Sequence, residues 1–362
     1  MVNLGIIGVG LVGSELISQL LSYSKHASSY SPTFKVVALA NTSKHLLSNA
    51  SYDSIDLSSW NSILKTNGVP VNIDAFVEYL SNSPDTAVVI DNTASQEIAH
   101  LYPQFLRKGL HIATPNKKAF SGDIKLYKEI LAEATRNRKL VYHESSVGAG
   151  LPVLSTLNDL IKTGDEIIKI EGIFSGTLSY LFNNFSYSSI SNESPKFSEI
   201  VMVAKNSGYT EPDPRDDLNG LDVARKVIIL GRIAGLDLTL ETLPVENIVP
   251  ESLRAVPTSA EFLTKLPEFD NHFESLNQKA RSSNQVLRYI GTVDVKGGNS
   301  SVKLMSLPVS HPFASLKGSD NIIAFTTRRF PNPLIIQGAG AGAAVTAFGV
   351  FSDLFKIAER SS

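Results

Sequence analysis

The sequence predicts an α/β protein of two domains, in which a domain with a parallel sheet precedes an α+β domain with a mixed sheet. Three observations lead to this prediction. The 362 residues, of which 43% are hydrophobic, are enough to form two full cores. Short apolar runs alternate with helical periodicity as far as residue 143, and a strand-rich segment lies between Val286 and Ile336.

Five runs with strand character are separated by helical stretches in the first part of the chain. They cover residues 3–8, 35–40, 86–91, 111–114 and 139–143. Such alternation favours parallel strands, because each helix returns the chain to the start of the next strand. We therefore expect a parallel sheet with helices on both faces.

The chain changes character after Gly150. A Ser-rich stretch at 186–195 has no assigned role, and it is followed by helical periodicity near 197–207 and 218–235. Strand-rich runs then follow, separated by Gly, Asn and Ser turns, at residues 287–295, 301–309 and 322–327. The apolar spacing at 342–357 predicts one last helix, which can return to the first domain.

Composition excludes several classes of function. The formal net charge of −2, without blocks of like charge, gives no electrostatic reason to bind nucleic acid or an anionic membrane, so we expect a small-molecule ligand. No apolar run reaches the roughly 18 residues of a membrane span, and the chain opens with a strand. Both features predict a cytoplasmic location. The absence of Cys excludes disulfides, thiolate zinc sites and thiol nucleophiles.

The segment GIIGVGLVGSEL has three glycines at G-x-G-x-x-G spacing, directly after the first strand. Gly8 permits a tight turn, Gly10 lets the backbone approach a pyrophosphate, and Gly13 allows close packing of helix and strand. Leu11 and Val12 open the helix, whose free N–H groups attract phosphate. The pattern predicts a Rossmann-type dinucleotide-binding domain, and a tight turn without a ligand is the alternative.

Residues after the second and third strands are candidate cofactor contacts. NAD-selective enzymes carry an acidic residue at the end of the second strand, where this chain has Asn41. A neutral Asn41 does not repel a 2′-phosphate, and Ser43 and Lys44 can bond one, so we expect NADPH to be accepted. A solvated Lys44 is the alternative. Asn92 and Thr93 follow the third strand, at the edge where open α/β sheets bind ligands.

Lys117 follows the next strand, in the segment IATPNKKAFSG. Pro115 and Asn116 shape the turn before it, so we expect Lys117 to face the cofactor crevice and Lys118 to be solvated. A desolvated lysine has a lowered pKa and can exchange a proton with a carbonyl oxygen. An ordinary surface lysine is the alternative.

Asp222 and Lys226 are spaced as an ordinary i,i+4 salt bridge, which is the simplest interpretation. However, the same helical face continues through Ile229 and Ile233, so we expect it to be buried. A charged pair at the buried end of such a face needs partners or a polar ligand.

Three further residues surround this pair in the sequence. Asp217 can cap the helix, Gly220 gives close access to the backbone, and Glu211 adds another carboxylate. Carboxylates together with a lysine are suited to holding the ammonium of an amino acid and polarising a carbonyl in its side chain.

The segment AKNSGYTEPDPRDDLNGLDVARK, from Ala204 to Lys226, resembles the signature of the homoserine dehydrogenase family throughout its length. TPNKKAF, VGAGLPVL, GTLSYLF and the late GAGAG are similar to other blocks of the family, in the same order. The resemblance covers essentially the whole chain, and its length is similar to that of the short, fungal-type form.

The resemblance implies a reversible reduction of L-aspartate 4-semialdehyde to L-homoserine by NAD(P)H, in threonine and methionine biosynthesis. It implies that Lys117 and Lys226 are catalytic and that one or both protonate the carbonyl oxygen. The substrate-binding residues that it implies are Gly176, Thr177, Tyr209, Glu211, Asp217 and Asp222.

The resemblance also implies a monovalent cation, Na⁺ or K⁺, and a homodimer. The cation ligands would be the Glu144 side chain and residues Val147, Ala149 and Leu151 of HESSVGAGL. Gly340, in a turn before the last helix, is our candidate for a further cofactor contact, and a tight crossover is the alternative. We place the dinucleotide-binding domain at 1–143 and 341–362, the substrate region at 153–289, and the dimerisation region at 144–152 and 290–340.

Three other functions also use a dinucleotide-binding domain of this kind. Aspartate-semialdehyde dehydrogenase requires a Cys nucleophile, which this chain lacks. Related two-domain sugar or inositol reductases use a His or Tyr near the lysine, whereas this turn offers only PNKK. A regulator that binds NADPH without turning it over is the alternative from a different class.

Overall fold

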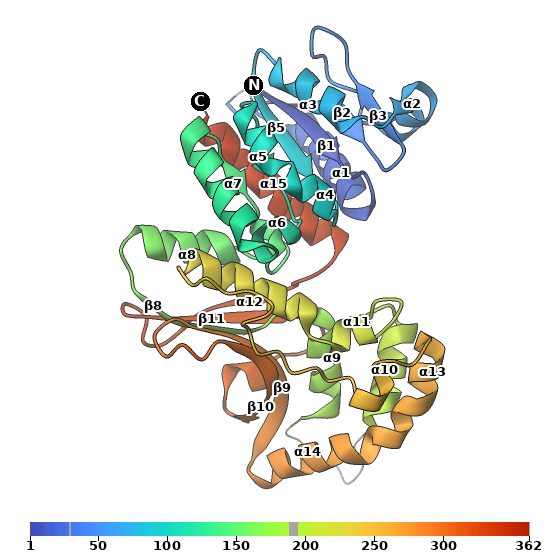
Figure 1. Cartoon of the computed structure of the whole chain (residues 1–362), viewed down its shortest axis with the longest axis vertical. Coiled ribbons are helices and arrows are strands. Elements are labelled where there is room, and N and C mark those ends of the chain that lie inside the picture. The colour runs from blue at the N-terminus through green and yellow to red at the C-terminus, as the bar shows by residue number, and fades with distance from the viewer. Residues whose placement is uncertain (29, 188–194, 362) are drawn as a thin grey trace. The chain divides into compact units, whose positions relative to one another are not determined.

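The computed structural model describes residues 1–28, 30–187 and 195–361 (Figure 1). Residues 188–194 of the Ser-rich stretch therefore lie outside the described residues. The chain forms two compact units. Unit 1 contains Met1–Pro152 and Gly342–Ser362, and unit 2 contains Val153–Ala341. Residues 144–152, which we assigned to a dimerisation region, belong to the compact body of unit 1.

Unit 1 is built on a seven-stranded sheet with the order β4-β3-β2-β1-β5-β6-β7. Its strands are β1 (Val2–Ile7), β2 (Phe34–Ala40), β3 (Lys44–Leu47), β4 (Val69–Pro70), β5 (Thr86–Asp91), β6 (His111–Ala113) and β7 (Val141–Tyr142). Neighbouring strands pair in parallel through β2, β1, β5, β6 and β7, which confirms the Rossmann-type sheet. β3 and β4 add an antiparallel edge that we did not predict.

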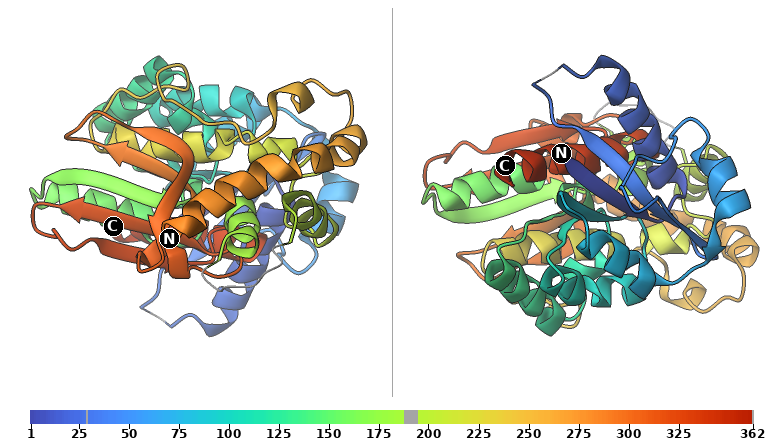
Figure 2. Two further views of the ribbon diagram at one scale, coloured as in Figure 1. Left: turned by 90° about the horizontal axis from the view of Figure 1, so that it is seen from below. Right: turned by 90° about the horizontal axis from the view of Figure 1, so that it is seen from above.

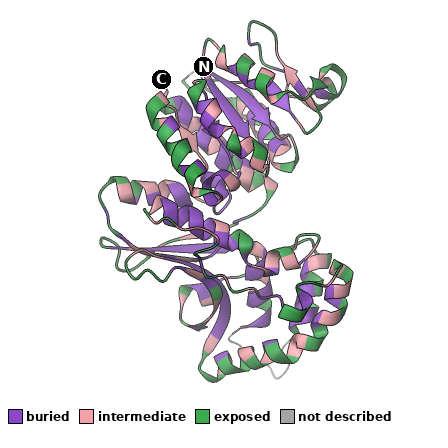
Figure 3. Cartoon of the chain, in the orientation of Figure 1, coloured by how far each residue is buried: buried purple, intermediate pink, exposed green. Residues whose placement is uncertain are grey.

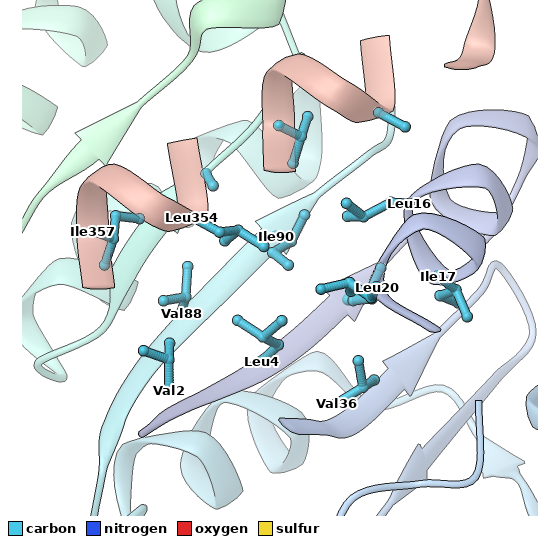
Figure 4. Packing of buried hydrophobic residues seen from close by; sticks show 14 of the residues in the cluster. Val2, Leu4, Leu16, Ile17, Leu20, Val36, Val88, Ile90, Leu354 and Ile357 are labelled. Carbon is cyan, nitrogen blue, oxygen red and sulfur yellow. The ribbon is translucent and has the colours of Figure 1, made fainter. Parts of the chain in front are cut away.

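Helices cover both faces of this sheet (Figure 1). They are α1 (Leu11–His26), α2 (Trp60–Asn67), α3 (Ile73–Ser81), α4 (Gln96–His100), α5 (Tyr102–Arg107), α6 (Lys118–Ser121), α7 (Ile124–Asn137) and α15 (Ala343–Arg360). The last helix returns to unit 1 and packs against α1, as its apolar spacing allowed. Figure 4 shows Leu16 and Leu20 of α1 and Leu354 of α15 in one cluster over the strands, with Ile90 between Leu354 and Leu16.

Unit 2 contains a five-stranded sheet with the order β10-β9-β8-β11-β12. Its strands are β8 (Ile167–Ile173), β9 (Gln285–Asp294), β10 (Ser301–Pro308), β11 (Asn321–Thr327) and β12 (Leu334–Gly338). All four pairings are antiparallel, so the predicted mixed sheet was wrong. The short connections at 295–300 and 328–333 form hairpins, whereas parallel neighbours would need longer crossovers.

The helices of unit 2 precede most of its strands in the sequence. They are α8 (Val153–Lys162), α9 (Gly176–Phe185), α10 (Phe197–Asn206), α11 (Arg215–Leu218), α12 (Leu221–Ile233), α13 (Ser259–Lys265) and α14 (Asp270–Ser282). α12 packs on β9 and β10, and α8 lies beside α12 (Figures 1 and 2). In each unit the central strands and the inward faces of the helices are buried, whereas the edge strands β4 and β12 are not (Figure 3). Across the described ranges, no helix has both the length and the apolarity needed to cross a membrane.

Candidate active site

The glycine turn after β1 has the geometry of a nucleotide cradle. A Cβ on Gly13 would lie 2.1 Å from the carbonyl oxygen of Gly8, so close packing requires glycine there. Gly8 has a φ of +89°, and a Cβ on it would approach Thr93 to 2.8 Å. A Cβ on Gly10 would meet nothing within 4 Å, which leaves space beside the start of α1. Gly10 caps α1 without a side chain, so the N–H groups of Leu11 and Val12 meet no capping side chain.

Asn92 lies against this turn with an unsatisfied side chain. Its backbone N–H donates to the carbonyl of Ile7 over 2.8 Å, and its Nδ2 would be 3.4 Å from a Cβ on Gly13. Both polar atoms of the amide are buried and have no hydrogen-bond partner within the described part of the chain. Buried polar groups are normally paired, so an orphaned amide beside a glycine turn is suited to a polar ligand.

A buried network ties the ends of β5 and β6 together. The carboxylate of Asp91 accepts hydrogen bonds from Thr93 Oγ1 at 2.6 Å, Tyr102 Oη at 2.6 Å and Asn116 Nδ2 at 3.0 Å. Burial raises the pKa of Asp91, and these hydrogen bonds act in the opposite direction. Thr114 Oγ1 donates to the carbonyl of Asp91 over 2.6 Å. The network fixes Thr93 and the turn before Lys117, and sequence reasoning missed the parts played by Asp91 and Tyr102.

Lys117 lies at the beginning of α6 and is half-buried. Asn116 Oδ1 accepts a hydrogen bond from the backbone N–H of Lys118 at 3.0 Å, so this turn is fixed on both sides of Lys117. The position of Lys117 directly after β6 is the one that the sequence predicted.

The turn after β2 contains the three residues that we predicted to contact the cofactor at its ribose 2′ position, Asn41, Ser43 and Lys44. Asn41 Oδ1 accepts hydrogen bonds from the backbone N–H of Ser43 at 2.9 Å and of Lys44 at 2.7 Å. The ammonium of Lys44 donates to the carbonyl of Lys65. These partners hold the turn that reverses the chain into β3.

The candidate cation ligands lie in a turn that is bonded to α15. Glu144 is buried, its Oε2 accepts from Lys356 Nζ at 3.0 Å, and its N–H donates to Asp353 Oδ2 over 2.9 Å. Lys356 Nζ also bonds Asp353 Oδ1 at 2.9 Å, and burial raises the pKa of Asp353 to about 6. Two carboxylates, those of Glu144 and Asp353, therefore share the single ammonium of Lys356. Ala149, with a φ of +52°, bends the backbone of the turn.

No group of three or more His, Cys, Asp or Glu side chains arranged to hold a metal occurs among the described residues. A cation at Glu144 would therefore also need the backbone carbonyls of Val147, Ala149 and Leu151.

In unit 2, Asp217 joins the loop after α10 to the start of α9. Its Oδ1 accepts from Thr177 Oγ1 at 2.8 Å, and its Oδ2 accepts from the N–H of Glu211 at 2.8 Å. Thr177 Oγ1 also lies 2.6 Å from the carbonyl oxygen of Tyr209. Burial raises the pKa of Asp217, and the negative charges of Glu211 and Asp222 raise it further. Three carboxylates therefore gather here, an arrangement that suits a cationic ligand.

Gly176 and Tyr209 border this acidic loop. Gly176 is the first residue of α9, and a Cβ on it would lie 3.1 Å from the carbonyl oxygen of Ser319. The ring of Tyr209 stacks on Tyr180 with 4.5 Å between centroids. Tyr209 is 44% exposed, so a ligand can reach it.

Lys226 forms the expected ion pair with Asp222, with 2.7 Å between Nζ and Oδ2. The pair is asymmetric, because the side chain of Lys226 is 9% exposed and that of Asp222 is 50% exposed. Lys226 Nζ also donates to the carbonyl of Phe174 over 2.6 Å, at the end of β8. Gly220 starts α12 with a φ of +76°, where a Cβ would clash with Tyr289. The ammonium is thus held between a carboxylate and a backbone carbonyl.

Gly340 is explained by packing inside unit 2. A Cβ on it would lie 2.0 Å from Nδ2 of Asn321, which is fully buried. Its predicted contact with the cofactor stays a prediction.

Comparison with known proteins places both halves of the chain in one family. The family model described as homoserine dehydrogenase matches residues 152–355, and the model of the homoserine dehydrogenase NAD-binding domain matches residues 8–144. A homoserine dehydrogenase of Schizosaccharomyces pombe is 49% identical over 98% of this chain and 95% of its own length.

Two solved structures are similar to the whole chain. A Candida auris protein of unknown function has 47% identity and a TM-score of 0.92, covering 99% of this chain and 98% of its own. A hyperthermophilic archaeal homoserine dehydrogenase in complex with NADPH has a TM-score of 0.74, with the same coverage of the two chains. Its identity of 21% supports the fold alone.

Proposed function

The chain belongs to the homoserine dehydrogenase family, and from that premise we propose how its residues divide the work of reducing L-aspartate 4-semialdehyde to L-homoserine. The glycine turn of unit 1 binds NAD(P)H, and the acidic loop of unit 2 binds the amino acid. The observation that carries this proposal is the buried Lys226, held by Asp222 beside the carboxylates of Glu211 and Asp217.

The acidic loop selects the substrate by its ammonium group. Glu211 and Asp222 are exposed carboxylates, and Asp217 lies behind them with both oxygens bonded within the protein. We assign Glu211 and Asp222 to the ammonium and Asp217 to holding the loop. Gly176, Thr177 and Tyr209 complete the pocket around the rest of the amino acid.

Lys226 supplies the proton in this mechanism. NAD(P)H provides a hydride for the aldehyde carbon, and the oxygen must then gain one proton to become a hydroxyl. The Lys226 ammonium lies 2.6 Å from the Phe174 carbonyl and 2.7 Å from the Asp222 carboxylate. Because these two partners restrict its rotamers, the ammonium is already oriented to donate a proton to that oxygen. We assign Lys117 to the same proton transfer, and its place in the fixed turn after β6 supports this role.

The residues of unit 1 fit a dinucleotide. Gly10 leaves room for the pyrophosphate, and the orphaned amide of Asn92 lacks a partner that a ligand can supply. We propose that both NADH and NADPH are used, since Asn41 places no carboxylate at the 2′ position. Ser43, Lys44, Thr93 and Gly340 are the remaining contacts that we assign.

A monovalent cation fits the turn at 144–151. Its donors would all be oxygen atoms, from the side chain of Glu144 and the backbone of Val147, Ala149 and Leu151, and hard cations prefer such donors. The sharing of the Lys356 ammonium by two carboxylates supports the proposal, because one ammonium is hydrogen-bonded to both of them and leaves carboxylate oxygens for a cation. When bound, the cation would stabilise this turn and take no part in proton transfer.

We also propose a homodimer built from the segments 144–152 and 290–340. β10 and β12 are the edge strands of the unit 2 sheet, and edge strands are open to pairing with another chain. Sedimentation equilibrium should therefore give twice the chain mass of 39.2 kDa, and a mass of 39.2 kDa at micromolar concentration would contradict the proposal.

The function is tested by following NADPH absorbance with purified protein and L-aspartate 4-semialdehyde. Oxidation should depend on the substrate and should reverse with L-homoserine and NADP⁺. If NADPH binds, as judged by its fluorescence, while no oxidation occurs in either direction, the protein is an NADPH-sensing regulator. Oxidation with another small carbonyl compound alone would indicate a related reductase.

A further inference from the structure

The backbone carbonyl of Phe174 accepts two hydrogen bonds from side chains that are far apart in the sequence. Lys226 Nζ donates over 2.6 Å, and Asn321 Nδ2 donates over 3.1 Å. All three residues are buried, with exposures of 1% for Phe174, 7% for Lys226 and 0% for Asn321. A carbonyl oxygen has two lone pairs, so these two donors together satisfy it and fix its direction.

The sheet places Asn321 opposite Phe174. Ile322 on β11 pairs with Ile173 on β8, so the preceding residue of β11 lies beside the residue that follows β8. On the other side, Asn321 pairs with Gly338 of β12. Gly340 then packs so closely that any Cβ would overlap the Asn321 amide. The amide is therefore held by its own strand, by β12 and by the turn after β12.

We propose that Asn321 is a positioning residue for Lys226. The inference rests on the proposed role of Lys226 as the proton donor. A lysine side chain has four rotatable bonds, and its ammonium is only as well placed as its acceptors are. Asp222 is half exposed and can move, whereas the Phe174 carbonyl is buried and is fixed by Asn321. Asn321 thus sets the direction from which Lys226 delivers its proton.

The chain offers a matched control in Asn277. Like Asn321, it is fully buried, its Nδ2 donates to one backbone carbonyl, that of Phe185, over 3.0 Å, and its Oδ1 has no partner within the described residues. It lies in unit 2 on α14, and its carbonyl partner does not bond Lys226. Asn277→Leu therefore removes the same kind of bond without touching the Phe174 carbonyl.

The experiment compares Asn321→Leu and Asn277→Leu in the whole protein. Both should lower the melting temperature by similar amounts. Only Asn321→Leu should lower kcat, by about 10- to 100-fold, and raise the solvent deuterium isotope effect on kcat, because proton delivery becomes slower. The KM for NADPH is measured beside kcat, because Gly340 packs on Asn321 and a loss of cofactor binding would raise that KM without raising the isotope effect. Asn321→Ala, which leaves more room, should reproduce the pattern if the leucine variant fails to fold.

The outcomes separate this inference from the proposed mechanism. If Lys226→Ala turns over at the wild-type rate, the proton-donor role is wrong and the role of Asn321 falls with it. If Lys226→Ala is inactive but the two asparagine variants have equal kcat and equal isotope effects, Asn321 is structural only. That second result overturns this inference and leaves the proposed function standing.

Discussion

Lys226 and Asp222 lie one helical turn apart on α12, but burial divides them. The ammonium is nearly enclosed, and the carboxylate is half exposed. An unpaired buried charge costs far more than an unpaired exposed one. The two partners therefore make unequal contributions to stability, and their substitutions should have unlike effects.

Asp222→Ala should destabilise the protein by about 1–2 kcal/mol, because it removes a carboxylate that pairs with the buried ammonium of Lys226. Lys226→Met should change stability little but should lower kcat by about 10²- to 10⁴-fold, the range of general acid catalysis. Urea unfolding and steady-state kinetics measure both effects. Lys265→Met is the matched control, since Lys265 and Glu261 form an i,i+4 pair at the same 2.7 Å on an exposed helix face. A Lys226→Met variant with wild-type kcat would contradict the mechanism.

Asn92 provides a second test at the scale of single residues. Its amide is unsatisfied without a ligand, and an unsatisfied buried group costs about 1–3 kcal/mol. Asn92→Leu should therefore leave the ligand-free protein as stable as before or more stable, while NADPH affinity falls at least about tenfold.

The control for Asn92 is Asn3, a buried asparagine of unit 1 whose Nδ2 has a partner and whose Oδ1 has none among the described residues. Its Nδ2 donates to Ser83 Oγ over 2.8 Å, so Asn3→Leu should lower stability without altering NADPH affinity. Calorimetry and fluorescence titration distinguish the two. Equal losses of stability in both variants would show that the amide of Asn92 is satisfied without a ligand.

At the scale of elements, strand ends carry the candidate site. Gly8 follows β1, Asn92 follows β5 and Lys117 lies beyond β6, and these three strands are neighbours in the sheet. β1 lies where the order changes direction, since β2 pairs on one side of it and β5 on the other. Open α/β sheets bind ligands at that point, because the loops there diverge and leave a crevice.

The pairing of β6 with β7 predicts a dependence of stability on pH. His111 Nδ1 accepts the N–H of Leu140 at 3.0 Å, and burial lowers the pKa of His111 to about 4 from the usual 6.5. The neutral imidazole is therefore required in the folded state. The contribution of the neutral imidazole to the free energy of unfolding is fully present above pH 6.5. This contribution is lost as the pH falls towards 4, by up to about 2–3 kcal/mol.

This dependence is measured by urea unfolding at several pH values. His111→Gln, which keeps an acceptor but does not titrate, should make stability fall less steeply between pH 6.5 and 4. Parallel curves for the variant and the wild type would show that His111 is protonated without cost in the folded state.

At the scale of the whole molecule, the chain returns to its first unit at its end. Met1 and Ser361 line the same surface hollow, and α15 supplies Ala347, Val350, Leu354 and Ile357 to the core beside α1. The last helix is thus part of the support beneath the glycine turn, although it lies more than 300 residues from it in the sequence.

Leu354→Ala should therefore lower the stability of unit 1 by about 2–5 kcal/mol, the cost of a cavity in a well-packed core. NADPH protects only the folded state, so saturating NADPH should raise the melting temperature of the variant as well. Glu359→Ala, on the exposed face of the same helix, should match the wild type. A Leu354→Ala variant as stable as Glu359→Ala would mean that α15 is not needed for the core.

The sequence by itself determined what depends on local pattern. The alternation of strands and helices, the glycine turn, the ion pair of Asp222 and Lys226 and the last helix all follow from spacing over a few residues. The family signature from Ala204 to Lys226 is also local, and the prediction of function rests on it. These features are readable because periodicity and turn chemistry act between near neighbours.

Only the tertiary structure decided which distant groups meet. Spacing shows which face of a strand is buried but not which strand lies beside it, so the antiparallel order of the second sheet and the edge of β3 and β4 were not predicted. Asn321 bonds a carbonyl 147 residues away, and Lys226 reaches the same carbonyl across 52 residues. Such pairings are selected by the packing of the whole sheet, because a buried polar group must find its partner wherever the fold brings one near.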